Sequence, residues 1–392
     1  MDTLSPSLTA QERQGLIRLR RDFHRHPELG FQEKRTAGVI AETLRGLGLA
    51  PTTGVAETGV VAMIGSAAGG RTLLLRADMD ALPIEEDGNK EYRSGFTGVM
   101  HACGHDGHSA TLLTACSALQ REAAALKGGR VKAIFQPAEE GAGGAKRMIA
   151  EGVLESPRVD AALGLHYWSI LPTGKVGVTA GPTMAAVDEF HLTVIGKGGH
   201  AAHPQEARDP VVAGAALVSA LQTLVSRRSD PLASVVVTVA EFHAGSAFNI
   251  IPAEARLAGT VRCFDKAIWE EIPTLIEHTA AGICHAHGCD YRLDYQRLNI
   301  PLVNDAAMAA LVRETAAELL GAENVVEVRT LGGEDMADYL DRVPGCFFFV
   351  GAGNTAKGIT ASHHHPAFDL DEDALAIGAE LLVRCARRYL AG

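Results

Sequence analysis

Nine consecutive residues, Met100 to His108, hold three histidines, a cysteine and an aspartate. Cys103 and His105 are two positions apart, so they cannot lie on one face of a helix, and we expect a loop that turns both side chains inward. Gly104 between them allows such a turn. A helix is predicted to start at Asp106, because residues 109–126 form an Ala- and Leu-rich helical run with this acidic group near its positive end. The sequence therefore indicates two metal-type ligands at the mouth of a rigid helix.

Further chemically active side chains follow apolar runs that are predicted to be buried strands. Asp80, the pair Glu139 and Glu140, and His166 each come within about four residues of the end of such a run. In open α/β sheets, sites form at the carboxyl ends of the strands, so we expect these side chains to gather at one edge. Neighbouring residues in extended chain point in opposite directions, which lets one glutamate bind a metal while the other reaches a bound water.

A histidine triplet, His363 to His365, adds to these donors. Taken alone, the triplet is either exposed polar chain or a supply of imidazole, and Cys103 with His105 is either a metal pair or a packed thiol beside a surface histidine. Together the segments offer five donors: Cys103, His105, Glu140, His166 and His364. Five donors are too many for one tetrahedral ion and suit two ions that share a thiolate bridge, for which Zn, Mn, Co and Ni all qualify.

Composition excludes several classes of function. A net charge of -11 argues against a nucleic-acid partner, because binding to a phosphate backbone needs a basic face. Residues Met1 to Pro6 lack the pattern of a secretion signal, and we find no apolar run that approaches the roughly 18 residues needed to span a bilayer. Seven scattered cysteines, an odd number, indicate thiols in a reducing compartment. We therefore expect a cytoplasmic protein with no membrane partner.

The 392 residues favour two domains over a single core. Segments 1–185 and 297–392 have the texture of an α/β domain with a mixed sheet flanked by helices. Segment 186–296 opens on the alternating strand Glu189 to Ile195 and continues in a β-α-β-β-α order, which is typical of a small α+β domain with helices on one sheet face. We expect the middle segment to be a domain inserted into the first.

Eight motifs, in this order along almost the whole chain, carry a resemblance to a known family. They are Arg76 to Pro83, Met100 to His108, Gln136 to Gly141, Gly164 to His166, Gly198 to Pro204, Phe248 to Pro252, Gly333 to Asp335 and His364 to Asp369. On these motifs the chain resembles the amidohydrolase branch of metallopeptidase family twenty. That branch contains hippurate hydrolases, N-acyl-amino-acid amidohydrolases and plant auxin-conjugate hydrolases.

The resemblance implies a zinc-peptidase-like catalytic domain and an inserted, ferredoxin-like dimerisation or lid domain in a homodimer or higher homo-oligomer. It also implies hydrolysis of N-acyl amino acids, with N-acetyl, benzoyl or related acyl groups. The water would be activated by two divalent ions per subunit, Mn²⁺ or Zn²⁺, with Co²⁺ and Ni²⁺ as alternatives. The small-molecule substrate would be the protein's other partner.

The family's site residues carry over position by position. The metal ligands match Cys103, His105, Glu140, His166 and His364, and Glu139 matches the general base. His200 matches a lid histidine that, in relatives, approaches the substrate carbonyl from the partner subunit. Asn249 and Arg262 match positions that bind the substrate carboxylate or stabilise the oxyanion.

Departures from the wider family narrow the prediction. Asp78 stands where many peptidases have the histidine of a His-x-Asp motif, and Cys103 stands where they have a bridging aspartate. Both features favour the amidohydrolase branch over a metallo-dipeptidase or carboxypeptidase, and the full ligand set argues against a catalytically silent metal- or ligand-binding homologue. Asp80 is interpreted as a catalytic-site carboxylate that orients a ligand histidine, with a turn or N-cap aspartate as the alternative. His363 is a weaker candidate ligand than His364.

Overall fold

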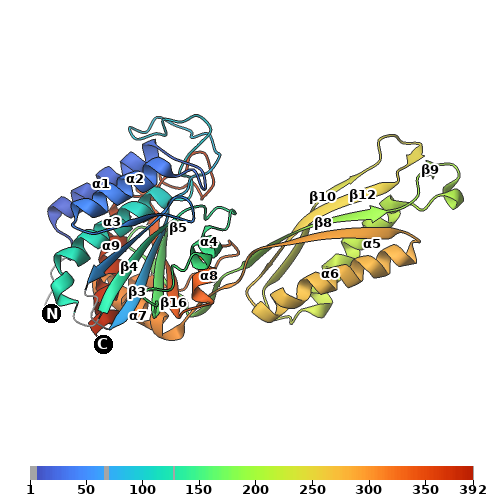
Figure 1. Cartoon of the computed structure of the whole chain (residues 1–392). Coiled ribbons are helices and arrows are strands. Elements are labelled where there is room, and N and C mark those ends of the chain that lie inside the picture. The colour runs from blue at the N-terminus through green and yellow to red at the C-terminus, as the bar shows by residue number, and fades with distance from the viewer. Residues whose placement is uncertain (1–6, 66–69, 127–128, 392) are drawn as a thin grey trace. The chain divides into compact units, whose positions relative to one another are not determined.

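The computed structural model describes residues 7–65, 70–126 and 129–391 (Figure 1). Residues 1–6, on which the expectation about a secretion signal was based, lie outside these ranges. The chain divides into two compact units: unit 1 comprises Met1–Gly181, Val303–Val328 and Asp338–Gly392, and unit 2 comprises Pro182–Leu302 and Arg329–Ala337. Residues Arg329–Ala337 of unit 2 fall within 297–392, a range that is predicted from the sequence to belong to the first domain.

Unit 1 is built on an eight-stranded mixed sheet. Its strands are β1 Thr52–Val55, β2 Gly59–Gly65, β3 Arg71–Asp78, β4 Gly129–Gln136, β5 Ala161–Pro172, β6 Val176–Gly177, β15 Val325–Val326 and β16 Gly345–Gly353, in the spatial order β1-β2-β4-β3-β5-β16-β6-β15. The four central strands β4, β3, β5 and β16 run parallel to one another. Their carboxyl ends therefore meet at one edge, as the sequence predicts for an α/β fold.

Helices cover this sheet, as Figure 1 shows for α1, α2, α3 and α9. The helices of unit 1 are α1 Ala10–Arg25, α2 Lys34–Gly46, α3 His105–Arg121, α4 Gly144–Ala150, α7 Ala306–Leu320 and α9 Asp373–Ala391, and the short α8 is Met336–Leu340. The helix predicted to start at Asp106 begins one residue earlier, so that His105 lies in its first turn, and it ends at Arg121. Gly104 caps it with φ +91°, a left-handed conformation that glycine adopts without steric strain.

Strand alternation decides which side chains of β5 reach the site. Leu163, Leu165 and Tyr167 point into the main core under the helices, together with Phe348 of β16. His166 lies between two of these core residues, so its ring points to the opposite face of the sheet.

Unit 2 contains a four-stranded antiparallel sheet with two long helices. Its main elements are β8 Ala186–Ile195, α5 Pro210–Thr223, β10 Val235–Ala244, β12 Glu254–Cys263, α6 Lys266–Ala286 and β13 Asp290–Asn299, with short strands β7 Gly181–Met184, β9 Gly199–His200, β11 Ile250–Ile251 and β14 Leu302–Asn304 at and beyond its ends. The spatial order β10-β12-β8-β13 is that of a ferredoxin-like βαββαβ domain. The sequence analysis missed β13, whose side chains alternate between exposed and half-buried and form no apolar run.

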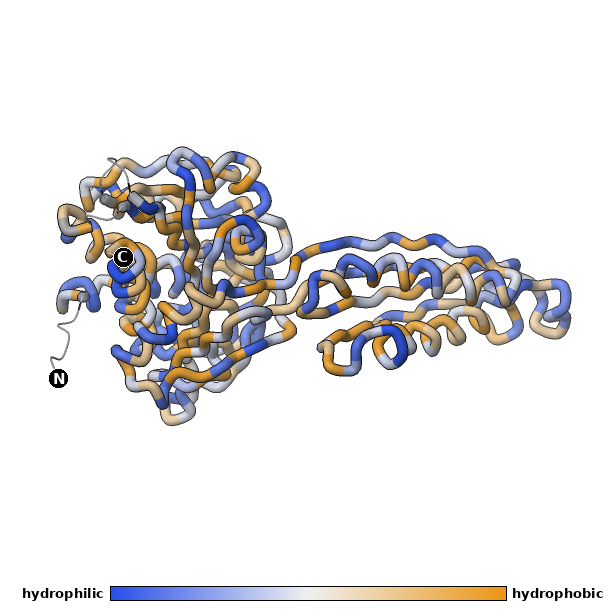
Figure 2. Tube along the Cα trace, turned by 90° about the horizontal axis from the view of Figure 1, so that it is seen from below, coloured by the Kyte–Doolittle hydropathy of each residue, from blue (hydrophilic) through white to orange (hydrophobic). Residues whose placement is uncertain are grey.

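One helix needs a correction to the sequence analysis. The helical stretch Pro210–Arg228 is long and apolar enough to cross a membrane by length and composition. In unit 2, however, Ala213, Leu217 and Leu221 are fully buried in a core shared with the sheet. Figure 2 shows apolar and polar positions interleaved along the helices of this unit, as expected for helices with one face on a sheet. We therefore interpret the stretch as a core-facing helix.

Candidate metal centre

The five predicted donors converge in unit 1, where we call Cys103, His105, Glu140, His166 and His364 the donor set. Their donor atoms form overlapping groups in which all atoms lie within 4.8 Å of one another. One group is Cys103 with His105 and His166, and another is Cys103 with Glu140 and His364. Cys103 belongs to both groups, as expected for a ligand that bridges two ions. Nε2 of His364 lies 3.3 Å from Oε1 of Glu140, and Sγ of Cys103 lies 3.4 Å from Nε2 of His166.

Unsatisfied polar atoms in the donor set fit a cation. Nε2 of His105 is buried without a hydrogen-bond partner among the described residues, and the buried Oε1 of Glu140 faces the ring of His364 without a well-aligned hydrogen bond. Such atoms are rare in folded proteins, because burial without a partner costs about 1–3 kcal/mol. Imidazole, carboxylate and thiolate are also the donor types that Zn and related divalent ions accept. The residues present therefore fit two divalent ions.

The protonation states of two donors depend on burial. Burial, with contributions from His108 and His363, holds the pKa of His166 well below its usual value, so the ring stays neutral and can donate a lone pair. Burial and the carboxylate of Glu140 raise the pKa of the Cys103 thiol well above its usual value. A divalent cation would reverse this preference, because a coordinated thiol is deprotonated.

Two carboxylates at the end of β3, Asp78 as its last residue and Asp80 just after it, contact the histidines of α3. Oδ1 of Asp80 lies 3.3 Å from Nδ1 of His105, and the other oxygen of Asp80 accepts the backbone N–H of Glu140 at 2.9 Å. Oδ1 of Asp78 lies 2.6 Å from Nδ1 of His108. The alternative interpretation of Asp80 as a simple turn or N-cap residue is therefore not supported by its contacts.

The sequence analysis missed the roles of Asp78 and His108. Nε2 of His108 accepts the backbone N–H of Tyr167 at 3.0 Å, so both ring nitrogens of His108 are engaged and the residue braces β5 beside His166. The signal was present in the spacing: His105 and His108 are three residues apart and share a helix face.

Within the histidine triplet, the structure separates three roles. Nε2 of His363 lies 2.8 Å from the carbonyl oxygen of Tyr167, and Nδ1 of His365 accepts the N–H of Ala367 at 3.0 Å. Only His364 of the three lies beside Glu140 in the donor groups of the described residues. His364 also adopts φ +62°, an uncommon conformation for a residue with a side chain and one that often marks a functional position.

Glu139 lies in unit 1 beside Glu140, whereas His200, Asn249 and Arg262 lie in unit 2. His200 on β9 pairs with Ile250, and the N–H of Ala201 donates to the carbonyl oxygen of Asn249 at 3.1 Å, so His200 and Asn249 lie together. Nδ1 of His200 accepts the N–H of Ala202 at 3.0 Å, which leaves the ring proton on Nε2. Arg262 lies at the far end of β12 and is not brought to this pair within unit 2.

Arg262 is held by its own strand. Its guanidinium donates to the carbonyl oxygen of Val261 at 3.0 Å and also contacts the Thr260 hydroxyl. Burial lowers its pKa, against the opposing charge of Asp188.

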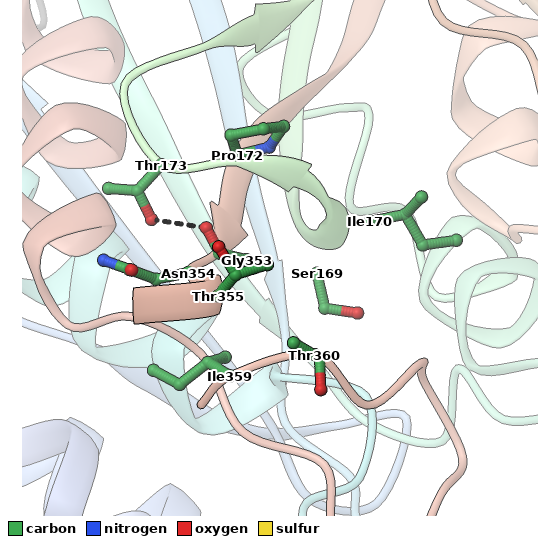
Figure 3. A pocket seen from close by; sticks show the side chains of 9 residues that line it. All are labelled: Ser169, Ile170, Pro172, Thr173, Gly353, Asn354, Thr355, Ile359 and Thr360. Carbon is green, nitrogen blue, oxygen red and sulfur yellow. Dashed lines mark hydrogen bonds between the residues drawn. The ribbon is translucent and has the colours of Figure 1, made fainter. Parts of the chain in front are cut away.

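A cavity of about 420 Å³ opens at the carboxyl ends of β5 and β16 (Figure 3). It is lined by Ser169, Ile170, Pro172, Thr173, Gly353, Asn354, Thr355, Ile359 and Thr360. None of these side chains carries a formal charge, and the hydroxyl of Thr173 is already used in a bond to the carbonyl oxygen of Gly353 at 3.2 Å (Figure 3). The cavity therefore suits neutral groups rather than a carboxylate, which would stay uncompensated there.

Comparison with known proteins places this architecture in a family. The model of peptidase family M20/M25/M40 matches residues 74–388. The chain is 40% identical over 380 residues to the IAA-amino acid hydrolase ILR1-like 4 of Arabidopsis thaliana, covering 96% of this chain and 86% of that protein. It is 39% identical over 375 residues to the N-acetylcysteine deacetylase of Bacillus subtilis, covering 95% and 96%.

A solved structure shares the fold at similar identity. The YXEP protein of Bacillus subtilis, described as a dinuclear metal binding peptidase from the M20 family, superposes with a TM-score of 0.85 at 34% identity and covers 98% of this chain and 99% of its own. The chain belongs to peptidase family M20/M25/M40. This confirms the resemblance drawn from the eight motifs and the α/β fold that it implies.

Proposed function

We propose that this protein hydrolyses the amide bond of N-acyl amino acids, releasing a carboxylic acid and a free amino acid. The carrying observation is the convergence of the donor set, with Glu139 in a further group beside His105 and Glu140. Relatives of about 40% identity, named as a deacetylase of N-acetylcysteine and a hydrolase of IAA-amino acids, support an acylated amino acid as substrate.

The donor set divides naturally between two ions. His105 and His166 would hold one ion, Glu140 and His364 the other, and the thiolate of Cys103 would serve both. When bound, two divalent ions would polarise the substrate carbonyl and lower the pKa of an attacking water. Mn²⁺ and Zn²⁺ are the first candidates, and Co²⁺ or Ni²⁺ can use the same ligands.

Glu139 is the residue that we propose as the proton carrier. It is adjacent to Glu140, and one oxygen of its carboxylate lies within 4.8 Å of donor atoms of His105 and Glu140. From there it would accept a proton from the attacking water and deliver it to the leaving nitrogen. Proton transfer by a positioned side chain typically raises the reaction rate by about 10²–10⁴. His200 would donate from Nε2 to the developing oxyanion, and Asn249 and Arg262 would bind the substrate carboxylate or assist the oxyanion.

The setting of the reaction forms part of the proposal. We propose a cytoplasmic enzyme that acts as a homodimer, with His200 serving the site of the partner subunit. A metallo-dipeptidase or carboxypeptidase is the alternative within the same family, and a silent metal-binding homologue is the alternative outside catalysis.

The test is release of free amino acid from a panel of N-acyl amino acids, beside free-amine dipeptides. Protein loaded with Mn²⁺ or Zn²⁺ would be compared with chelated protein and with Glu139→Gln. Metal-dependent turnover of the acylated panel that falls by about 10²–10⁴ in the variant is expected. Faster turnover of dipeptides would favour the peptidase, and bound metal without turnover of either panel would favour the silent homologue.

A further inference from the structure

Arg20, on α1, lies at the centre of a buried ion-pair network in unit 1. Its side chain has no exposed surface. Nε donates to Oδ2 of Asp106 at 2.8 Å, and Nη2 donates to Oδ1 of Asp369 at 2.7 Å. The guanidinium also lies over the ring of Tyr92, 4.6 Å from its centroid, and the Tyr92 hydroxyl donates to the other oxygen of Asp369 at 2.7 Å. These contacts hold Arg20 in one orientation.

Arg20 has three acidic partners: Asp106, Asp369 and Glu372, whose Oε1 lies 3.3 Å from Nη1. The first two belong to the two chain segments that carry ligands. Asp106 directly follows His105 in the first turn of α3, and Asp369 comes five residues after His364. The backbone between these segments is also joined, since the N–H of His364 donates to the carbonyl oxygen of Ala102 at 2.9 Å. The Arg20 guanidinium therefore links two chain segments, and each segment carries a ligand of a different proposed ion.

We call the contact of the Asp106 and Asp369 segments around Arg20 the junction, and its close packing leaves little room for movement. A Cβ atom added at Gly107, in the first turn of α3, would lie 3.1 Å from Leu370 and 3.2 Å from both Leu375 and Tyr167. Such distances are tighter than ordinary van der Waals contact, so a shift of Asp106 or Asp369 would be passed to the neighbouring ligand segments.

We propose that Arg20 is a positioning residue that fixes His105 and His364 relative to each other, so that the donor set binds two divalent ions tightly. The inference rests on the proposed metal centre. A guanidinium has donors in a rigid planar fork and can bond two carboxylates at a fixed angle, whereas the lysine ammonium is a point charge on a flexible stem. The planar geometry of the Arg20 guanidinium, and not only its charge, therefore holds the two segments at a fixed angle.

The surrounding charges allow variants of Arg20 to fold. Nδ1 of His24 lies 2.8 Å from Asp106, and Nζ of Lys90 lies 3.4 Å from Asp369, so each acid keeps a second basic neighbour when Arg20 is replaced. Arg13 offers a matched control on the same helix: it pairs with Glu380 at 2.8 Å, and no contact of Arg13 with Asp106, Asp369 or Glu372 is found among the described residues.

The experiment measures Zn²⁺ binding by competition with a chromophoric chelator, for the full-length protein and the variants Arg20→Lys, Arg20→Met and Arg13→Met. We expect at least one Zn²⁺ of the Arg20 variants to bind about 10- to 100-fold more weakly, with Arg13→Met within about twofold of the parent. At saturating Zn²⁺ the Arg20 variants should recover most of kcat with an unchanged KM. A role in folding alone would lower Tm without changing Zn²⁺ affinity.

The outcomes separate this inference from the proposed function. If the parent protein and Glu140→Gln bind Zn²⁺ alike, the proposed metal centre is wrong, and the inference is overturned with it. If the parent binds two Zn²⁺ ions and the Arg20 variants bind both within about twofold of it, only the positioning role is overturned. Should Arg20→Met fail to fold, Arg20→Lys and Asp369→Asn break the same bridge and decide the question.

Discussion

Oδ1 of Asp80 lies 3.3 Å from Nδ1 of His105, and both side chains are buried. The second oxygen of Asp80 accepts the backbone N–H of Glu140. One carboxylate therefore orients the ring of one proposed ligand and the backbone of another. Carboxylate partners of this kind set the tautomer and direction of a ligand histidine, which leaves Nε2 of His105 facing the other donors.

Replacing Asp80 by asparagine should weaken metal binding. The amide keeps the size of the side chain but removes the charge that favours a strongly donating imidazole. We expect the affinity for Mn²⁺ or Zn²⁺ and kcat/KM to fall about 10- to 100-fold, measured by chelator competition and by turnover of an N-acyl amino acid. Asp87→Asn, at an exposed position nearby, is the matched control. Equal metal affinity of Asp80→Asn and Asp87→Asn would contradict the orienting role.

Replacing Cys103 by serine should remove the shared ligand. A serine hydroxyl is a far poorer donor to borderline metals than a thiolate. We expect bound metal to fall from two equivalents to at most one, and Co²⁺-loaded protein to lose its thiolate charge-transfer absorption. Cys289→Ser, at a half-buried thiol of unit 2, should retain both properties. A persisting charge-transfer band in Cys103→Ser would show that another thiol binds the ion.

Replacing His200 by alanine should slow turnover without loss of metal. Its Nε2 proton is available because Nδ1 accepts the N–H of Ala202. Loss of one oxyanion donor typically costs about 10²–10³ in kcat. The adjacent exposed His203, whose ring lies 5.5 Å from that of His200, provides the control His203→Ala.

Mixing variants tests whether His200 acts across a homodimer. If it does, His200→Ala refolded together with Glu139→Gln should regain about a quarter of the parent activity, because half of the dimers then contain one intact site of two. Activity no higher than the sum of the two separate variants would place the histidine in the site of its own subunit.

Protein stability should depend on pH through His24. Burial disfavours the charged ring, but Asp106 at 2.8 Å and Glu86 at 3.1 Å outweigh it and raise the pKa of His24 above its usual value. A histidine whose pKa is raised on folding contributes stability that is complete below the unfolded pKa of about 6.5 and is lost as pH rises through the folded pKa.

The free energy of unfolding of the parent protein should therefore decline above pH about 6.5, by up to about 1.4 kcal/mol per pH unit from this group. His24→Gln should lack that component. Urea unfolding of both proteins between pH 6 and 9, with a chelator that removes metal from both, isolates the difference. Parallel pH profiles would contradict the shifted pKa of His24.

Local sequence was sufficient for the donor types and their place at strand ends. Short apolar runs predict buried strands, and Asp80 and Glu140 follow the ends of β3 and β4 as expected. The prediction for His166 was wrong in position, because β5 continues to Pro172 and His166 lies inside it. Eight local motifs along the chain carried the resemblance to the family, which the comparisons confirm.

The tertiary structure alone decided which neighbours complete the site. The triplet taken alone leaves its three members open, the resemblance favours His364, and in the fold His364 is the member that lies in a donor group with Cys103 and Glu140 among the described residues. The sequence likewise had no signal for Arg20, because its partners Asp106 and Asp369 are 86 and 349 residues away in the chain. Residue type and short spacing are local properties, whereas burial and pairing depend on which distant segments the folded sheet brings together.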